Sequence, residues 1–180
     1  MSVGMLILRV VVGLLFIGHG TQKLFGWFGG GGPEGTSGFF GSLGYRSPRT
    51  MALVGGLTET VGGVLVLIGL LTPLGSALLV GMMVSAILAV HIDKGVWNSN
   101  GGIELPLVFI ACATAIAFSP GRYAIDGALD LGLDGKLSGV LALSAGLLAG
   151  VAVEVTMRST AAPPPSTAAE EPTEENRAAA

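Results

Sequence analysis

The chain has 180 residues, of which 51% are hydrophobic and 12% are charged, and its mean hydropathy is +0.74. A soluble domain carries about twice that fraction of charge, so the composition predicts an all-α membrane protein with several membrane-spanning helices. The net charge of −3 arises in residues 159–180. The preceding 158 residues are neutral, and they contain no basic patch or motif that would predict nucleic-acid binding.

Five apolar stretches reach or approach the length needed to cross the ~30 Å hydrocarbon core of a bilayer. In chain order they are Val3–Phe25, Met51–Leu71, Leu74–Ile92, Ile103–Ser119 and Leu137–Met157. We therefore expect a four-helix transmembrane bundle plus a fifth transmembrane helix, in contact with the lipid bilayer.

Small residues recur every four positions in the third and fifth stretches, and glycine pairs flank Glu59 in the second. In a membrane, such residues let helices approach closely, so they predict packing within the bundle. Homo-oligomerisation is the alternative interpretation for the last stretch. The residues are Ala77, Gly81, Ser85 and Ala89; Gly55, Gly56, Gly62 and Gly63; and Ala142, Gly146 and Gly150.

The connections differ in composition and in charge. Residues 26–50 are rich in glycine and predict a long loop, and residues 93–102 predict a polar loop that carries Trp97. Asp126, Asp130 and Asp134 follow one another at four-residue spacing, which favours one face of a short interfacial helix. The tail from Ser159 is rich in Ala, Pro and Glu, which is typical of disorder.

Counting spans places the long first loop, the Trp97 loop and the tail on one side of the membrane. Six Lys and Arg lie there, against two on the side of Met1. The positive-inside rule then predicts that these loops and the tail are cytoplasmic. If the fifth stretch did not span, the two counts would be equal.

Ionisable residues inside the apolar stretches are the strongest functional signal, because a charge in a bilayer costs several kcal/mol unless it is paired or hydrated. Their depth along the helices brings most of them toward the membrane face below the Trp97 loop. Arg9 lies nearer the side of Met1, and we expect it to contact Glu59. Glu154 is expected to reach water near the tail. The predicted polar pocket comprises Arg9, His19, Lys23, Glu59, His91, Trp97, Asn98 and Glu104.

Each of these residues also has a structural interpretation. Lys23 could extend to the lipid head groups, Glu104 could favour the first turn of a helix, and Trp97 could be an interfacial anchor. No spacing predicts a metal site. Cys112 is expected to be a packing residue, and a single cysteine excludes an intramolecular dithiol. The pattern assigns no catalytic residue.

These positions resemble the DoxX family of small bacterial membrane proteins. The resemblance covers roughly residues 5–126, which it implies are a DoxX-like four-helix membrane domain. Residues 127–158 are then a connector and fifth transmembrane helix, and residues 159–180 a disordered acidic tail. The matching residues are Arg9, Gly13, Phe16, His19, Gly20, Lys23, Leu24 and Phe25; Glu59, Gly62 and Gly63; and His91, Trp97, Gly102 and Glu104.

The resemblance implies a bacterial inner (plasma) membrane protein that is a subunit of a redox system linked to a quinone, to sulfur or to oxidative stress. In our leading hypothesis it holds a quinone, to which His19 and Lys23 donate hydrogen bonds while Glu59 and Glu104 relay protons. No flavin, haem or iron–sulfur motif is present, so we expect a soluble redox enzyme partner rather than a self-sufficient enzyme. One alternative is a small-solute or proton-coupled transporter that uses Glu59 as its switch. Another is a membrane anchor that recruits soluble enzymes.

Overall fold

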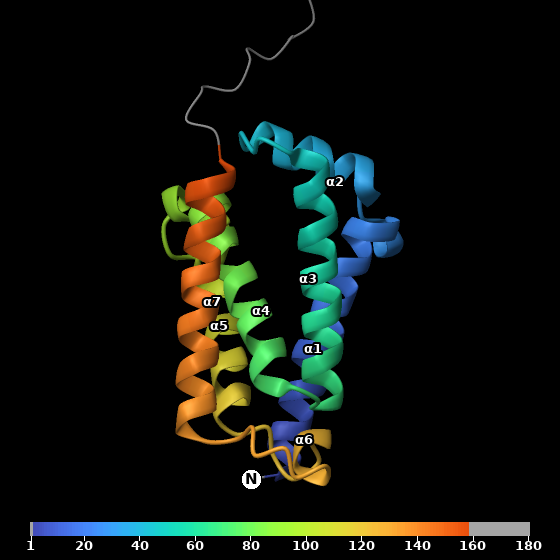
Figure 1. The fold of residues 1–180 in the computed structure, drawn as a ribbon. Coiled ribbons are helices and arrows are strands. Elements are labelled where there is room, and N and C mark those ends of the chain that lie inside the picture. Colours follow the sequence, from blue (N-terminus) through green and yellow to red (C-terminus); the bar gives the residue numbers. More distant parts are fainter. Residues whose placement is uncertain (1, 159–180) are drawn as a thin grey trace, which may run out of the picture.

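A computed structural model describes residues 2–158, and within them the fold is an all-α membrane bundle (Figure 1). Each long helix is apolar over most of its length, as a bilayer requires of a segment whose backbone must satisfy its own hydrogen bonds. The α-helices are α1 (Ser2–Phe25), α2 (Gly32–Ser42), α3 (Pro48–Ile68), α4 (Thr72–Ala86), α5 (Glu104–Phe118), α6 (Ile125–Ala128) and α7 (Lys136–Met157). Short 3₁₀ or π segments are η1 (Trp27–Gly29), η2 (Ile87–His91), η3 (Ile92–Lys94) and η4 (Asn98–Asn100).

Among residues 2–158, four helical segments are long and apolar enough to cross a membrane. They are Val3–Phe25, Pro48–Ile68, Thr72–Lys94 and Lys136–Met157, and the third of them runs through α4, η2 and η3. The predicted span Ile103–Ser119 is not among these four. It forms α5, which has 15 residues and is therefore about 22 Å long.

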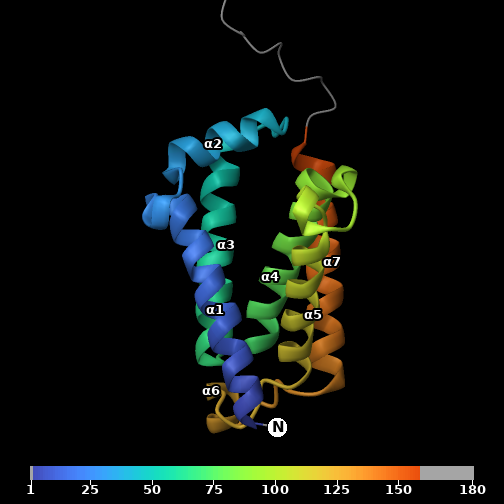
Figure 2. The same cartoon turned by 180° about the vertical axis from the view of Figure 1, so that it is seen from behind.

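The helices form two arms that diverge toward one end of the molecule (Figures 1 and 2). In one arm α1 packs along α3 and α2 crosses its top; in the other, α4 packs against α5 and α7. We call the end that carries α2, the 93–103 loop and the end of α7 the α2 end. The opposite end, with the start of α1, the α3–α4 turn and α6, is the α6 end. Within residues 2–158 the predicted division of the connections between two sides is thus confirmed, whereas the position of the tail and the cytoplasmic assignment stay predictions.

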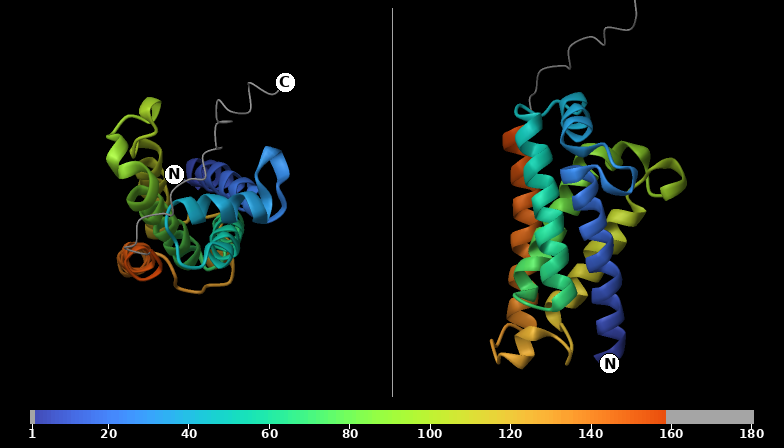
Figure 3. Two further views of the ribbon diagram at one scale, coloured as in Figure 1. Left: turned by 90° about the horizontal axis from the view of Figure 1, so that it is seen from above. Right: turned by 90° about the vertical axis from the view of Figure 1, so that its right-hand side faces the viewer.

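Glycines bring the helices of each arm into close contact. Figure 3 shows the arrangement of these helices from two further directions. A Cβ atom built on Gly63 would lie 2.8 Å from the carbonyl oxygen of Gly13, and one on Gly20 would lie 2.6 Å from that of Gly56. In the other arm, a Cβ on Gly146 would lie 2.7 Å from the Cβ of Val80. The small-residue stripes therefore pack within the bundle, as predicted.

Two predicted connections differ from what the structure shows. Residues 26–50 are not a continuous loop, because α2 occupies Gly32–Ser42, with Pro33 in its first turn, where its missing N–H costs no hydrogen bond. The predicted interfacial helix is only four residues long, and Asp130 has a φ of 51°, so the three aspartates do not share a helix face. The predicted disorder of the tail lies outside the described residues.

Candidate functional site

A small cavity lies between the two arms near the α2 end. It has a volume of about 170 Å³ and receives side chains from α1, α3, α4, η2, η4 and α5. Four of the predicted pocket residues line it: His19, Glu59, His91 and Asn98. The remaining lining residues are apolar, namely Phe16, Met83, Ala86, Leu105, Pro106 and Phe109. The cavity is therefore an apolar space with a few polar groups, which is the usual composition of a small-molecule site.

Glu59 is the most deeply buried charge at this cavity. It lies in the middle of α3, its relative exposure is 3%, and its Oε2 forms an ion pair with Nζ of Lys23 on α1. The pair is possible because Gly20 and Gly56 let α1 and α3 touch one turn from it. Among residues 2–158, Lys23 is the polar partner of Glu59, and its side chain is 25% exposed. Lys23 therefore compensates the buried carboxylate rather than simply reaching for the head groups.

His91 ends η2, a single π-helical turn that follows α4 directly. π-Helical turns shift the register of a helix and are frequent at functional sites. The Nδ1 atom of His91 lies 2.6 Å from the carbonyl oxygen of Gly101. A carbonyl only accepts hydrogen bonds, so Nδ1 carries a proton and the neutral ring keeps Nε2 as an acceptor. In the ring that lines the cavity, Nδ1 is thus held by the carbonyl of Gly101, and Nε2 can still accept a hydrogen bond.

The 93–103 loop is held by its own hydrogen bonds. Oε2 of Glu104 accepts a hydrogen bond from the backbone N–H of Asn98 at 2.9 Å, and the N–H of Gly102 donates to the carbonyl of Trp97 at 3.0 Å. Glu104 therefore fixes the loop that brings Asn98 to the cavity, and it is not itself a lining residue. Trp97 is 65% exposed and does not line the cavity either.

An aromatic pair forms the apolar wall of the cavity. Phe16 on α1 and Phe109 on α5 meet edge to face, with ring centroids 5.1 Å apart. Sequence reasoning named Phe16 but missed Phe109, because an apolar residue in an apolar helix carries no signal of its own. The spacing of Leu105 and Phe109 by one turn of α5 indicates only a shared face.

Arg9 does not belong to this cavity, and the predicted contact between Arg9 and Glu59 is wrong. Arg9 is 1% exposed and lies at the α6 end. Its guanidinium donates to four carbonyl oxygens, those of Val66 and Leu67 at 3.0 Å, Pro120 at 3.1 Å and Tyr123 at 3.3 Å. The first two belong to the last turn of α3, where carbonyls lack partners within the helix, so Arg9 acts as a C-cap.

Glu154 is buried rather than solvated, which corrects a second prediction. It is 9% exposed, accepts a hydrogen bond from the hydroxyl of Tyr45, and has Arg158 3.6 Å from its Oε2. Tyr45 follows α2, outside the spanning helices. Its pKa is raised above the ordinary value of a tyrosine, mainly by burial and secondly by the hydrogen bond to Glu154. This contact ties the two arms together at the α2 end.

The cavity thus combines a carboxylate and two imidazoles beside two phenyl rings. Lys23 does not line it, but its ammonium group is paired with the carboxylate. Such a set can hydrogen-bond the oxygens of a flat, polar-edged ring and can exchange protons with it. Among residues 2–158, no group of three His, Cys, Asp or Glu is arranged to hold a metal ion.

Comparison with known proteins gives the chain its family. The DoxX family model matches residues 4–92, which include α1, α3 and most of the Thr72–Lys94 span. The chain is 40% identical over 118 residues to a Bacillus subtilis (strain 168) protein named "Putative oxidoreductase CatD". That match covers 66% of this chain and 81% of the relative. No solved structure matches the chain. The chain is a multi-pass membrane protein that belongs to the DoxX family.

Proposed function

We propose that the protein is a membrane subunit of a redox system and that its cavity binds the head group of a quinone. The observation that carries this proposal is the ion-paired Glu59 in the middle of a helix long enough to cross a membrane, where it lines an apolar cavity together with His19 and His91. Ionisable residues at such a depth mark proton or substrate paths in membrane proteins. The name of the Bacillus subtilis relative agrees with a redox role.

The size of the cavity fits a head group better than a whole ligand. Its volume of about 170 Å³ is below the 300–1,000 Å³ that is usual for drug-sized molecules. A single substituted ring is small enough for this volume. Its faces would lie against Phe16 and Phe109, and its edge would point toward the polar residues. A hydrocarbon tail would then lie outside the cavity, in the bilayer.

The residues of the cavity have separate tasks. His19 donates a hydrogen bond to one oxygen of the ring. His91, held by the carbonyl of Gly101, accepts or delivers a proton at Nε2. The carboxylate of Glu59, whose charge Lys23 compensates, accepts a proton and passes it to an oxygen of the ring. A bound quinone would supply the two-electron, two-proton chemistry.

The electrons must come from elsewhere, since the sequence carries no flavin, haem or iron–sulfur motif. We therefore place the electron donor in a soluble redox enzyme that docks at the α2 end. The 93–103 loop lies directly over the cavity there, and the exposed Trp97 is available to a partner.

The test is mass spectrometry of the lipids extracted from gently purified protein. The wild type should carry quinone close to one molecule per chain, and Glu59→Gln and His19→Ala should each reduce it at least tenfold. Glu34→Gln, on the exposed face of α2, changes a carboxylate far from the cavity and serves as the matched control. Quinone at the level of the surrounding membrane in the wild type would rule the proposal out and leave the transporter and anchor hypotheses.

A further inference from the structure

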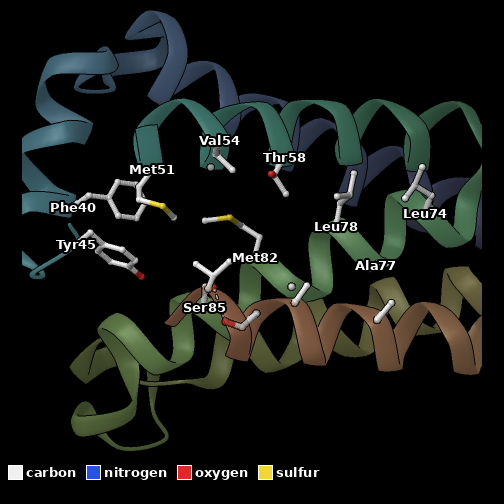
Figure 4. A pocket seen from close by; sticks show the side chains of 16 residues that line it. Phe40, Tyr45, Met51, Val54, Thr58, Leu74, Ala77, Leu78, Met82 and Ser85 are labelled. Atoms are coloured by element: carbon white, nitrogen blue, oxygen red, sulfur yellow. Dashed lines mark hydrogen bonds between the residues drawn. The ribbon is translucent and has the colours of Figure 1, made fainter. Parts of the chain in front are cut away.

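A second, larger space lies between the arms, on α3, α4 and α7, and the proposed function does not use it. Its volume is about 320 Å³ and it opens to the side of the spanning helices. Figure 4 shows Phe40, Tyr45 and Met51 at one end of it and Leu74 at the other. We propose that this groove binds one acyl chain of an anionic phospholipid whose phosphate lies among the arginines of the α2 end.

The shape of the groove matches an extended hydrocarbon chain. On α4 its lining runs from Leu74 to Ser85, which is about 16 Å along the helix. On α7 it runs from Ala145 to Val153, so the groove lies parallel to the spans, as the lipid chains of a bilayer do. Small residues form its floor. A Cβ atom built on Gly150 would lie 2.7 Å from the carbonyl oxygen of Gly81, so α4 and α7 touch there and close the groove on that side.

Polar side chains are scarce within the groove: Tyr45, Thr58 and Ser85 are the ones that line it, and two of their three hydroxyls are engaged in hydrogen bonds. The hydroxyl of Ser85 donates to the carbonyl of Gly150 at 3.2 Å. That of Tyr45 donates to Glu154. With these donors engaged, a polar ligand would find little to bind inside, whereas a hydrocarbon chain replaces bilayer lipid at no desolvation cost.

The charge at the mouth of the groove decides the kind of lipid. Tyr45 lines the groove, and Arg46 and Arg49 follow it on the exposed surface. The backbone N–H of Arg46 donates to the carbonyl of Met157 at 2.9 Å, which brings Arg158 to the same place. Within residues 2–158, the only ion pair of these three arginines is that of Arg158 with Glu154.

Three arginines against one buried carboxylate leave a net charge of about +2 where spanning helices meet the head groups. Basic pockets between transmembrane helices bind anionic lipid head groups, and each Lys or Arg near the membrane surface adds about fivefold to the affinity. A phosphatidylglycerol therefore satisfies both parts of the site, its acyl chain in the groove and its phosphate among the guanidinium groups.

Native mass spectrometry of the full chain in a mild detergent tests this inference. After delipidation, the wild type should bind one dioleoyl-phosphatidylglycerol, and it should bind it at least tenfold more tightly than dioleoyl-phosphatidylethanolamine. Ala149→Phe fills the groove from α7 and should abolish binding of the first lipid. Ala152→Phe is the matched control, since Ala152 is exposed on α7 but does not line the groove. Its lipid binding should equal that of the wild type.

A second pair of variants tests the head-group site without filling the groove. Arg46→Gln combined with Arg49→Gln should reduce the preference for phosphatidylglycerol about 25-fold, at roughly fivefold per arginine. Arg122→Gln removes an exposed arginine at the α6 end and should leave the preference unchanged. Equal binding of the two lipids by the wild type, or undiminished binding by Ala149→Phe, would overturn the inference. Quinone content is a separate readout, so either proposal can fail alone.

Discussion

Two buried charges on neighbouring helices, Arg9 and Glu59, have opposite surroundings. Arg9 at the α6 end meets four backbone carbonyls and no cavity. Glu59 near the α2 end meets one ammonium group, which is partly exposed, and borders a cavity. A buried charge that is fully satisfied by backbone fixes structure, because moving it breaks several hydrogen bonds at once. One that is incompletely satisfied keeps the capacity to bind a ligand or exchange a proton.

Removing Arg9 should have the largest effect on stability. Arg9→Met leaves four buried carbonyls without donors, two of them at the end of α3, and should lower the free energy of unfolding by about 3–5 kcal/mol. Arg9→Lys should recover only part of this, since one ammonium group cannot reproduce the planar fork of a guanidinium. Thermal unfolding in detergent measures both. A loss below 1 kcal/mol in Arg9→Met would remove the contrast with Glu59.

Asp126 should come next, because it completes the same end of the bundle. Its carboxylate accepts hydrogen bonds from the backbone N–H of Leu71 at 2.6 Å and from the N–H and hydroxyl of Thr72 at 2.8 and 2.6 Å. It thereby caps the start of α4 from a distant part of the chain. Asp126→Ala should cost about 2–3 kcal/mol. Asp134→Ala, at an exposed position without a positive φ, is the matched control and should be near neutral.

Tyr45 should show a smaller effect that depends on pH. Tyr45→Phe removes the hydroxyl bonded to Glu154 and should cost about 1–2 kcal/mol. Because the pKa of Tyr45 is raised in the folded state, this group's contribution is fully present below the unfolded pKa of about 10 and is lost as pH rises above it. Between pH 8 and 11, the free energy of unfolding should therefore fall more steeply with pH for the wild type than for Tyr45→Phe. Parallel curves would contradict the assignment.

Glu59→Gln should have the smallest effect on stability and the largest on ligand binding. The amide fits the same space and still accepts a hydrogen bond from Lys23, which is 25% exposed and stays hydrated. We expect a change in unfolding free energy of about 1 kcal/mol or less, together with the loss of bound quinone described above. A loss as large as that of Arg9→Met would make Glu59 a structural residue and erase the difference between the two ends.

The sequence determined the spans, their order and the side of each connection, since length and apolarity alone decide which segments cross a bilayer. It also identified His19, Glu59 and His91, because an ionisable residue stands out in an apolar helix. It counted α5 as a span although this helix has only 15 residues, and it missed α2, whose glycine-rich sequence is typical of a loop.

Only the tertiary structure decided which charges meet. Arg9, Lys23 and Glu59 all lie on the facing surfaces of α1 and α3, and the sequence cannot rank their pairings, because a pairing depends on depth along both helices. Glycine contacts set that depth, placing Lys23 beside Glu59 and Arg9 beside the last turn of α3. The position of Glu154 likewise depends on Tyr45, which is 109 residues away in the chain, and no local sequence pattern predicts this contact.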